Sequence, residues 1–312
     1  MSGDLDDPLG LSAQARKAAP VRLDASMTPS VAFVVVAGEC VDHWRTNAAM
    51  LRETRAAPHL HQTRVGIRRL RSAFSLFRRL LHEVPGSREV AHRLRGLALP
   101  FGPARDLDVL LSGPLGETLD HRQYARLLED REDAYDAVLA ILSSPEWTAA
   151  GRDLDELLGG SGSWPDAGDL DDLARTALRR RARRVLRGRG HLAEMTAADR
   201  HAVRIEAKKL RYGCEFFAAL FPAEQPRVIT DDGTVLVGGL AYATLAEDVQ
   251  SALGALNDHA TADAILHHVG ARAPEVDAEA LLAAGVDAVA RLEAAAEFWA
   301  VEPQRSSTPL PG

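Results

Sequence analysis

The sequence predicts an all-α protein made of two helical halves, and three observations support that fold class. Apolar residues recur at spacings of three and four along nearly the whole chain, as in helices with one buried face. Turn-forming dipeptides are scarce outside two short segments. A stretch of the first half recurs in the second half, which indicates an internal repeat. With 312 residues, 46% of them apolar, the chain can bury one large core or two of ordinary size.

Helices are expected wherever the apolar residues keep this spacing. The three successive valines at 34–36 favour a strand by propensity. Phe33, Val41 and Trp44 around them keep the helical spacing, so we assign the valines to the first helix. In the first half, helices should cover residues 30–56, 60–83, 87–99, 104–112 and 117–142. In the second half, they should cover residues 169–188, 196–221, 241–256, 258–270 and 275–300.

The remaining segments are expected to be irregular. A stretch rich in Gly, Ser and Pro lies between the two halves, and we interpret it as a linker. The two chain ends show no apolar period and are expected to be flexible. Residues 226–239 contain Asp-Asp-Gly and Gly-Gly, which predicts an inserted loop or a small hairpin. The expected organisation is a flexible N-terminus at 1–28, a first half at 29–158, a linker at 159–168, a second half at 169–301 and a flexible tail at 302–312.

Composition excludes several classes of protein. Two cysteines, Cys40 and Cys214, cannot form a disulfide framework, which favours a reducing, cytoplasmic compartment. No apolar run approaches the ~20 residues that a membrane-spanning helix needs, and the acidic start is unlike a secretory signal. We therefore expect no membrane partner. The formal net charge of −7 disfavours a polyanionic partner on average, although net charge does not show how the charges are arranged.

The repeat carries the basic residues. Residues 61–77 read HQTRVGIRRLRSAFSLF, and residues 201–217 read HAVRIEAKKLRYGCEFF. On a helix with about 100° per residue, each segment has a basic stripe opposite an apolar face. The first stripe contains His61, Arg64, Arg68, Arg71 and, further along, Arg78; the second contains His201, Arg204, Lys208 and Arg211, with Arg69 and Lys209 beside them.

This stripe is expected to bind an anion. No acidic residue occurs between Arg64 and His82, so the helix lacks the ion pairs that usually stabilise a solvated face. Residues 175–189 form a third basic segment with eight arginines and no acid, and we include Arg179 and Arg183 in the predicted site. A plain solvated surface and a nucleic-acid contact remain alternatives for this third segment.

A second repeated signal follows each basic helix. Gly102 precedes Arg105, Asp106 and Asp108, and Gly254 precedes Asn257 and Asp258. We expect each glycine to end one helix and the polar residue after it to cap the next. The aspartates are expected to orient arginines of the stripe, a structural role rather than a catalytic one.

These residues resemble the conserved histidine α-helical domain (CHAD) family. The resemblance rests on the two repeated segments, on RDLDVL at 105–110 and on LGALND at 253–258, and covers roughly residues 30–300. It implies two pseudo-symmetric antiparallel helical bundles around a basic central groove or pore that binds inorganic polyphosphate, with location on polyphosphate granules. Thr63 stands where the family often has Met. The implied binding residues are His61, Arg64, Arg68, Arg69, Arg71, His201, Arg204, Lys208, Lys209 and Arg211.

The expected function is therefore non-enzymatic binding of inorganic polyphosphate, without a cofactor, a catalytic residue or a metal. Arginine forks bind phosphate through two hydrogen bonds, and release of counterions would make the affinity depend on salt. Further partners would be other polyanions and granule-associated proteins. With reference pKa values near 6.5, His61 and His201 should tighten binding as the pH falls through that range.

Two other functions remain as alternatives. A phosphoanhydride-processing protein would need a phosphate loop or metal ligands at diagnostic spacing, and the sequence has neither, although Asp106, Asp108 and Asp258 are potential Mg²⁺ ligands. A generic polyanion or nucleic-acid binder would use aromatic side chains for base stacking, and Tyr212 is the one aromatic candidate beside the stripe.

Overall fold

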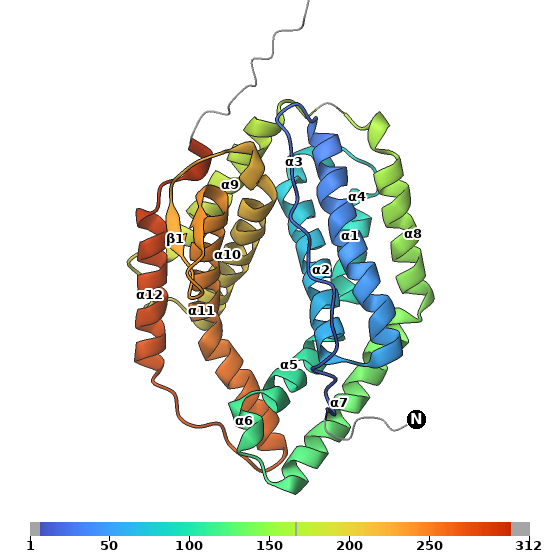
Figure 1. The fold of residues 1–312 in the computed structure, drawn as a ribbon, viewed down its shortest axis with the longest axis vertical. Coiled ribbons are helices and arrows are strands. Elements are labelled where there is room, and N and C mark those ends of the chain that lie inside the picture. The colour runs from blue at the N-terminus through green and yellow to red at the C-terminus, as the bar shows by residue number, and fades with distance from the viewer. Residues whose placement is uncertain (1–6, 166, 301–312) are drawn as a thin grey trace, which may run out of the picture.

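Helices form nearly all of the regular structure in the computed structural model, which describes residues 7–165 and 167–300 (Figure 1). The N-terminal group lies on the right in Figure 1 and the C-terminal group on the left. The N-terminal group consists of α1 (Pro29–Thr54), α2 (Ala57–Leu76), α3 (Arg78–Leu81), α4 (Ser87–Leu97), α5 (Phe101–Ser112), α6 (Pro114–Glu117), α7 (His121–Leu142) and α8 (Pro145–Gly159). The C-terminal group consists of α9 (Leu170–Val185), α10 (Ala197–Phe217), α11 (Gly238–His268) and α12 (Ala278–Ala294).

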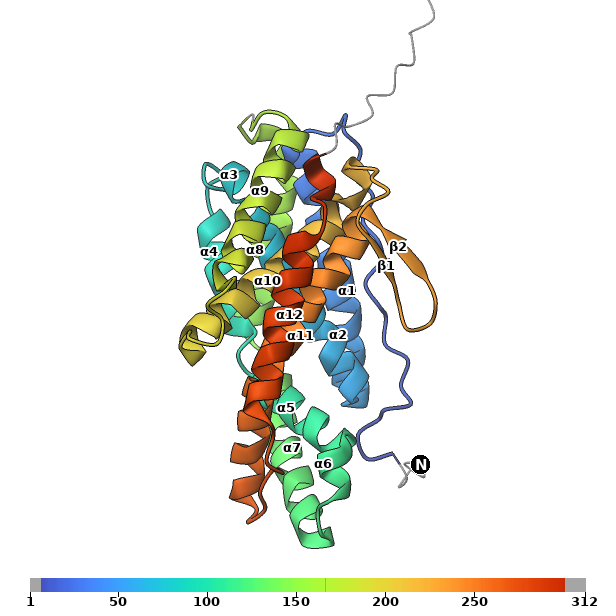
Figure 2. The ribbon, with the colours of Figure 1, turned by 90° about the vertical axis from the view of Figure 1, so that its left-hand side faces the viewer.

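Short elements complete the chain. Four 3₁₀ turns lie at Ser161–Ser163, Leu186–Gly188, Ala218–Leu220 and Phe298–Ala300. Strands β1 (Arg227–Ile229) and β2 (Val235–Val237) pair antiparallel, with Val228 opposite Leu236, and project from the C-terminal group (Figure 2). The hairpin predicted for residues 226–239 is confirmed. None of the helices in the described residues has both the length and the hydropathy of a bilayer-spanning segment.

Helices α1 and α2 pack antiparallel as the centre of the N-terminal group. The side chain of Thr28 caps α1 by accepting a hydrogen bond from the Val31 amide, and the valines at 34–36 are helical as expected. Close approach of the two helices depends on Gly66, because a Cβ there would lie 2.9 Å from the backbone of Trp44. In the C-terminal group, α10 is the central helix and packs between α9 and α11.

One continuous apolar core joins the two groups. The rings of Phe77, at the end of α2, and Phe217, at the end of α10, lie 5.5 Å apart. Gly213 of α10 lets Leu76 of α2 approach closely, since a Cβ there would lie 3.1 Å from the leucine side chain. A second apolar cluster joins the C-terminal end of α11 to α5 and α7 through Leu266, Leu107 and others. The two basic helices are thus held next to each other from both ends.

The structure corrects three of the helix boundaries expected from the sequence. Residues 241–256 and 258–270 are one helix, α11, because Asn257 and Asp258 continue it rather than cap a new one. Helix α8 was missed, although Ser144 caps it and Pro145 occupies its first turn, a usual start signal. The predicted helix at 60–83 is interrupted at Phe77, which separates α2 from α3.

The N-terminal segment also differs from the expectation of a flexible end at 1–28. Residues 7–28 form no helix, but Leu9, Val21 and Leu23 are buried. The Ala57 amide donates to the Leu9 carbonyl, so the segment is fixed at the start of α2. Its apolar residues are too few to show a period, yet enough to anchor it on α1 and α2. The expected tail at 302–312 lies outside the described residues.

The packing at Gly66 gives a first testable prediction. Gly66→Ala should lower the free energy of unfolding by about 1–3 kcal/mol, because the added methyl group forces α1 and α2 apart. Gly38→Ala on α1 is the control, since no atom lies within 4 Å of its added Cβ, and should stabilise by up to about 1 kcal/mol. Urea unfolding of both variants measures the difference. A Gly66 variant as stable as the wild type would show that the helices do not need this close contact.

Candidate functional site

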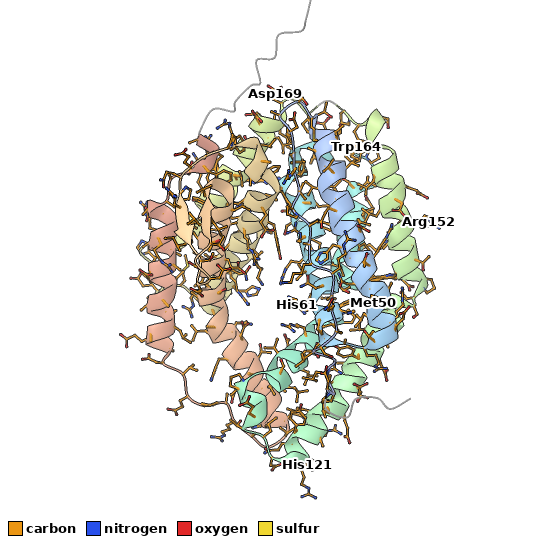
Figure 3. The ribbon with its side chains drawn as sticks, viewed as in Figure 1. Met50, His61, His121, Arg152, Trp164 and Asp169 are labelled. Atoms are coloured by element: carbon orange, nitrogen blue, oxygen red, sulfur yellow. The ribbon has the colours of Figure 1, made fainter. Side chains whose placement is uncertain are left out.

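The repeated basic segments lie on α2 and α10, and the apolar face of each helix orients it. Leu60, Ile67 and Leu70 are buried on α2, and Val203 and Leu210 are buried on α10. The basic side of each helix is left facing the other group of helices. Figure 3 shows the His61 side chain on the side of α2 that faces the C-terminal group.

Six basic side chains from three helices meet there, and we call them the central cluster. Each acts electrostatically on its neighbours: the charges of Arg64 and Arg68 lower the pKa values of both His61 and Lys208. Arg105 joins from α5, where the sequence had suggested only a structural role. The central cluster consists of His61, Arg64 and Arg68 of α2, Arg105 of α5, and Arg204 and Lys208 of α10.

In the part of the chain that the structure describes, only Arg204 of this cluster has a carboxylate in direct contact. Among the described residues, His61, Arg105 and Lys208 make no side-chain hydrogen bond or ion pair. Arg68 donates to the hydroxyl of Tyr212 at 2.9 Å, which is a neutral partner. Tyr212 itself is buried and held by this contact, so its ring is not free to stack on a base. The cluster is therefore a concentration of positive charge without matching carboxylates.

The pKa values of His61 and Lys208 are lowered by burial first and then by repulsion among these charges. Burial, together with Arg105, Arg68 and Arg64, lowers the pKa of His61 to about 4. Burial, together with Arg204, Arg68 and Arg64, lowers the pKa of Lys208 to about 7. In the free protein His61 is therefore neutral near pH 6.5, which corrects the expected pH range for this histidine. A bound anion would relieve the repulsion and favour the protonated forms of both groups.

The two glycine signals have a different function from the one expected. Gly102 and Gly254 do not separate helices: they lie inside α5 and α11. A Cβ at Gly254 would lie 2.8 Å from the Arg204 guanidinium, so glycine is needed there for the arginine to lie across α11. At Gly102 a Cβ would lie 3.4 Å from the guanidinium of Arg64. Both glycines therefore lie against an arginine of the central cluster, and Gly254 is the one whose lack of a side chain makes room for it.

Two aspartates lie beside these arginines, as the sequence suggested. Asp258 pairs with Arg204 at 3.2 Å, and its side chain is 64% exposed. Asp106 is half-buried, and its charge acts on Arg64 and on Asp258, although burial raises its own pKa. Asp258 holds Arg204 in place, whereas Asp106 acts on the arginines through its charge, and neither neutralises the whole cluster. Asn257, next to Asp258, is exposed on α11.

The structure places three predicted binding residues outside the central cluster, each in an ion pair. Arg69 is buried and pairs with Glu215 and, at 3.7 Å, with Glu39. Lys209 pairs with Glu206 at 2.7 Å. Arg211 pairs with Glu215 at 3.1 Å and also with Glu247. The pairs of Arg69 and Arg211 join α1, α2, α10 and α11, whereas the pair of Lys209 lies within α10.

The other predicted binding residues are exposed and do not belong to the central cluster. His201 is exposed at the start of α10, one turn before Arg204. Arg71 is exposed on α2, near Arg95 of α4. Arg78 on α3 and Arg179 and Arg183 on α9 are exposed too, and none of them makes a side-chain hydrogen bond or ion pair with the described residues.

Asp108 forms a buried polar network between α5 and α7. It is fully buried and accepts hydrogen bonds from Nε of Arg131 and the hydroxyl of Tyr135, both at 2.8 Å. Arg131 also donates to the Arg55 carbonyl at 3.1 Å. The network fixes α5, and with it Arg105 and Gly102, against the rest of the N-terminal group.

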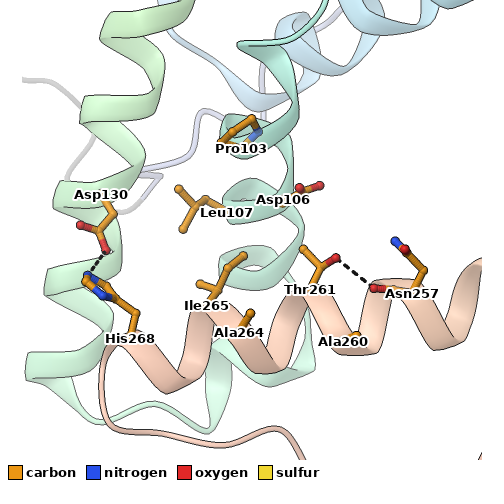
Figure 4. A pocket seen from close by; sticks show the side chains of 10 residues that line it. All are labelled: Pro103, Asp106, Leu107, Asp130, Asn257, Ala260, Thr261, Ala264, Ile265 and His268. Atoms are coloured by element: carbon orange, nitrogen blue, oxygen red, sulfur yellow. Dashed lines mark hydrogen bonds and ion pairs between the residues drawn. The ribbon is translucent and has the colours of Figure 1, made fainter.

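A cavity of about 630 Å³ lies between α5, α7 and α11 (Figure 4). Its wall is mostly apolar, with Leu107 and Ile265 facing each other across it. His268 and Asp130 pair at 3.5 Å on one side. The lining contains no arginine or lysine, so this cavity does not provide the charge that an anion requires. The central cluster is the better candidate site.

Comparisons with known proteins agree with this fold. Residues 35–267 match the model of the CHAD domain family. The crystal structure of the CHAD domain from the plant Ricinus communis is 27% identical, with a TM-score of 0.69 over 90% of this chain and 92% of that chain. PptA from Streptomyces chartreusis is 17% identical, with a TM-score of 0.54 over 86% of this chain and 96% of that chain, a likeness of fold alone. No curated protein matches the sequence.

The buried Asp108 network gives a prediction that separates structural from binding aspartates. Asp108→Ala should lower the free energy of unfolding by about 3–5 kcal/mol, because it removes the buried carboxylate that binds Arg131 and Tyr135 and leaves Arg131 only the half-exposed Glu132. Asp106→Ala, two residues away and half-buried, should cost no more than about 1 kcal/mol. Urea unfolding monitored by circular dichroism measures both. Equal losses would contradict the assignment of Asp108 to the fold.

Proposed function

Because this chain belongs to the CHAD domain family, we propose that it binds inorganic polyphosphate at the central cluster and catalyses no reaction. The observation that carries the proposal is the unpaired positive charge at Lys208 and Arg105, beside Arg68. Each of these groups has N–H donors and lacks a carboxylate acceptor among the described residues. Phosphate oxygens supply such acceptors, and charge-assisted bonds to them are short and strong.

A linear polyanion suits the shape of the site better than a single small anion. The basic side chains come from α2, α5 and α10, and a linear chain of phosphates would contact them one after another as a row. We propose that this row lines a basic groove between two pseudo-symmetric helical halves. The pairs Arg64 with Gly102 and Arg204 with Gly254 support that symmetry, because each arginine lies against a glycine of a neighbouring helix.

The alternatives have less support from the site. Base stacking would need an accessible aromatic ring, and Tyr212 is buried. Phosphoanhydride cleavage would need a positioned catalytic group, and Asp106 lies beside arginines that would bind phosphate rather than activate water. In a cell, binding would bring the protein to cytoplasmic polyphosphate granules, where its acidic outer surface would be available to granule-associated proteins.

Reversal of charge in the central cluster tests the proposal. Arg68→Glu/Lys208→Glu should lower the affinity for polyphosphate at least ~100-fold, because two charged hydrogen-bond donors become repulsive acceptors. Arg122→Glu/Arg227→Glu is the matched control, with the same change in net charge at two exposed positions on α7 and β1. Isothermal titration calorimetry at fixed salt measures both variants, and thermal unfolding confirms that they fold.

Competition and phosphate-release measurements distinguish polyphosphate binding from the alternative functions. Labelled polyphosphate should resist competition by DNA and RNA at physiological salt, and the pure protein should release no phosphate from it. Equal affinity for all three polymers would reduce the function to generic polyanion binding. Unchanged affinity of the double variant would exclude the central cluster as the binding site.

Lys208 gives the binding a defined pH dependence. It faces Arg64 and Arg68 of α2, Arg204 on its own helix and Asp258 of α11, and its pKa in the free protein is about 7. A bound polyanion raises that pKa, so binding above pH 7 must take up a proton. Lys208 therefore contributes fully to the affinity below pH 7, and the affinity should fall by up to about tenfold per pH unit above pH 7.

The measurement is a series of titrations between pH 7 and pH 9 at constant ionic strength. Lys208→Arg should bind with little pH dependence over this range, because arginine stays charged. Protonation of His61 should strengthen polyphosphate binding only at acidic pH, down to about pH 4, because its pKa in the free protein is about 4. An equally steep pH dependence in wild type and Lys208→Arg would show that another group takes up the proton.

A further inference from the structure

A second group of arginines lies where α9 meets the end of α2 and the start of α3. We call Arg78, Arg180, Arg181 and Arg184 the α9 cluster. The guanidiniums of Arg180 and Arg181 both donate to the Ser75 carbonyl, at 3.1 and 2.9 Å, which fixes the cluster on α2. Burial and the charges of Arg181, Arg78 and Arg184 lower the pKa of Arg180 to about 10.

The α9 cluster has more positive charge than its carboxylate can neutralise. Glu206 accepts from Arg181 at 2.6 Å, from Arg184 at 3.4 Å and from Lys209 at 2.7 Å. These cations lower the pKa of Glu206 to about 2 even though burial opposes the shift. Glu206 is thus fully engaged. Nε of Arg180 is buried without a hydrogen-bond partner, and Arg78 has no hydrogen bond or ion pair with the described residues.

A row of unpaired cations connects the α9 cluster to the central cluster. Ser75 lies seven residues after Arg68 on α2, which is ~10 Å along a helix with a rise of ~1.5 Å per residue. Arg71 lies between them and is exposed, with Arg95 of α4 close enough to act on it. A single extended chain of phosphates can therefore contact both clusters, whereas pyrophosphate is too short to span them.

We propose that the α9 cluster is a second phosphate-binding site, which makes the protein selective for long polyphosphate chains. The inference rests on the proposed function and adds the site that distinguishes chain lengths. Once a chain is bound at the central cluster, its contact with the α9 cluster is intramolecular and takes place at a high effective concentration. A short chain contacts one cluster at a time and gains nothing from the second.

The test uses Arg78→Gln/Arg180→Gln in the full chain, titrated with pyrophosphate and with a long-chain polyphosphate at low ionic strength. Arg181 keeps its bond to the Ser75 carbonyl in this variant, so α9 stays attached to α2. The affinity for the long chain should fall at least tenfold, and the affinity for pyrophosphate should change less than threefold. The dependence of the long-chain affinity on salt should also become less steep, since fewer counterions are released.

Arg79→Gln is the matched control, because Arg79 is adjacent to Arg78, is exposed and already pairs with Asp172 at 2.7 Å. It should leave both affinities unchanged. If the wild type binds both ligands and the double variant loses the same factor for each, or loses nothing, the second site is excluded while the proposed function stands. A wild type that binds neither ligand would exclude the proposed function and the second site together.

Discussion

Repulsion among like charges at the junction of α2 and α10 is the constraint on which the rest of the structure depends. Burial and this repulsion together bring the pKa of Lys208 to about 7 and that of His61 to about 4. The association of the two helices must therefore be driven by other contacts. The shared apolar core supplies them, with Phe77 against Phe217 where the two helices end. The cluster is held in place by residues that do not belong to it.

Whether a basic side chain in this protein has a carboxylate partner depends on the face of the helix on which it lies. Glu206 and Glu215 lie on α10 itself, yet they neutralise Lys209, Arg69 and Arg211 rather than the central cluster. Beside the cluster, Asp258 pairs with Arg204, and Asp106 acts through its charge on Arg64, Arg105 and Arg204. As a result, positive charge remains on one face of α10, whereas the basic side chains of Lys209 and Arg211 are neutralised by carboxylates. A solvated basic helix would not need this arrangement, since water would screen each charge equally on every face.

The sequence was sufficient for the helical class and the basic stripe, because these depend on the local period of about 3.6 residues, and the repeated motifs were sufficient for the resemblance to the family. It was not sufficient to tell Arg69 from Arg68, since what distinguishes them is whether a carboxylate of another helix reaches them. The sequence pattern also predicted the wrong role for Gly254. A glycine before Asn and Asp is usual at a helix end, but here it lies inside α11 and makes room for Arg204. The sequence also did not indicate a role for Arg180, because its neighbour Arg78 is distant in sequence and only the fold brings the two side chains together.

The net charge of −7 is compatible with an anionic ligand because screening limits how far each carboxylate acts. At physiological ionic strength the Debye length is about 8 Å, so charges on the far side of the protein contribute little at the central cluster. What matters there is the local balance, in which Asp106 and Asp258 oppose four arginines and Lys208. Asp258 is exposed and can exchange Arg204 for water at little cost, whereas a half-buried lysine cannot regain its hydration. The acidic surface and the basic site therefore act independently, the first on solubility and the second on binding.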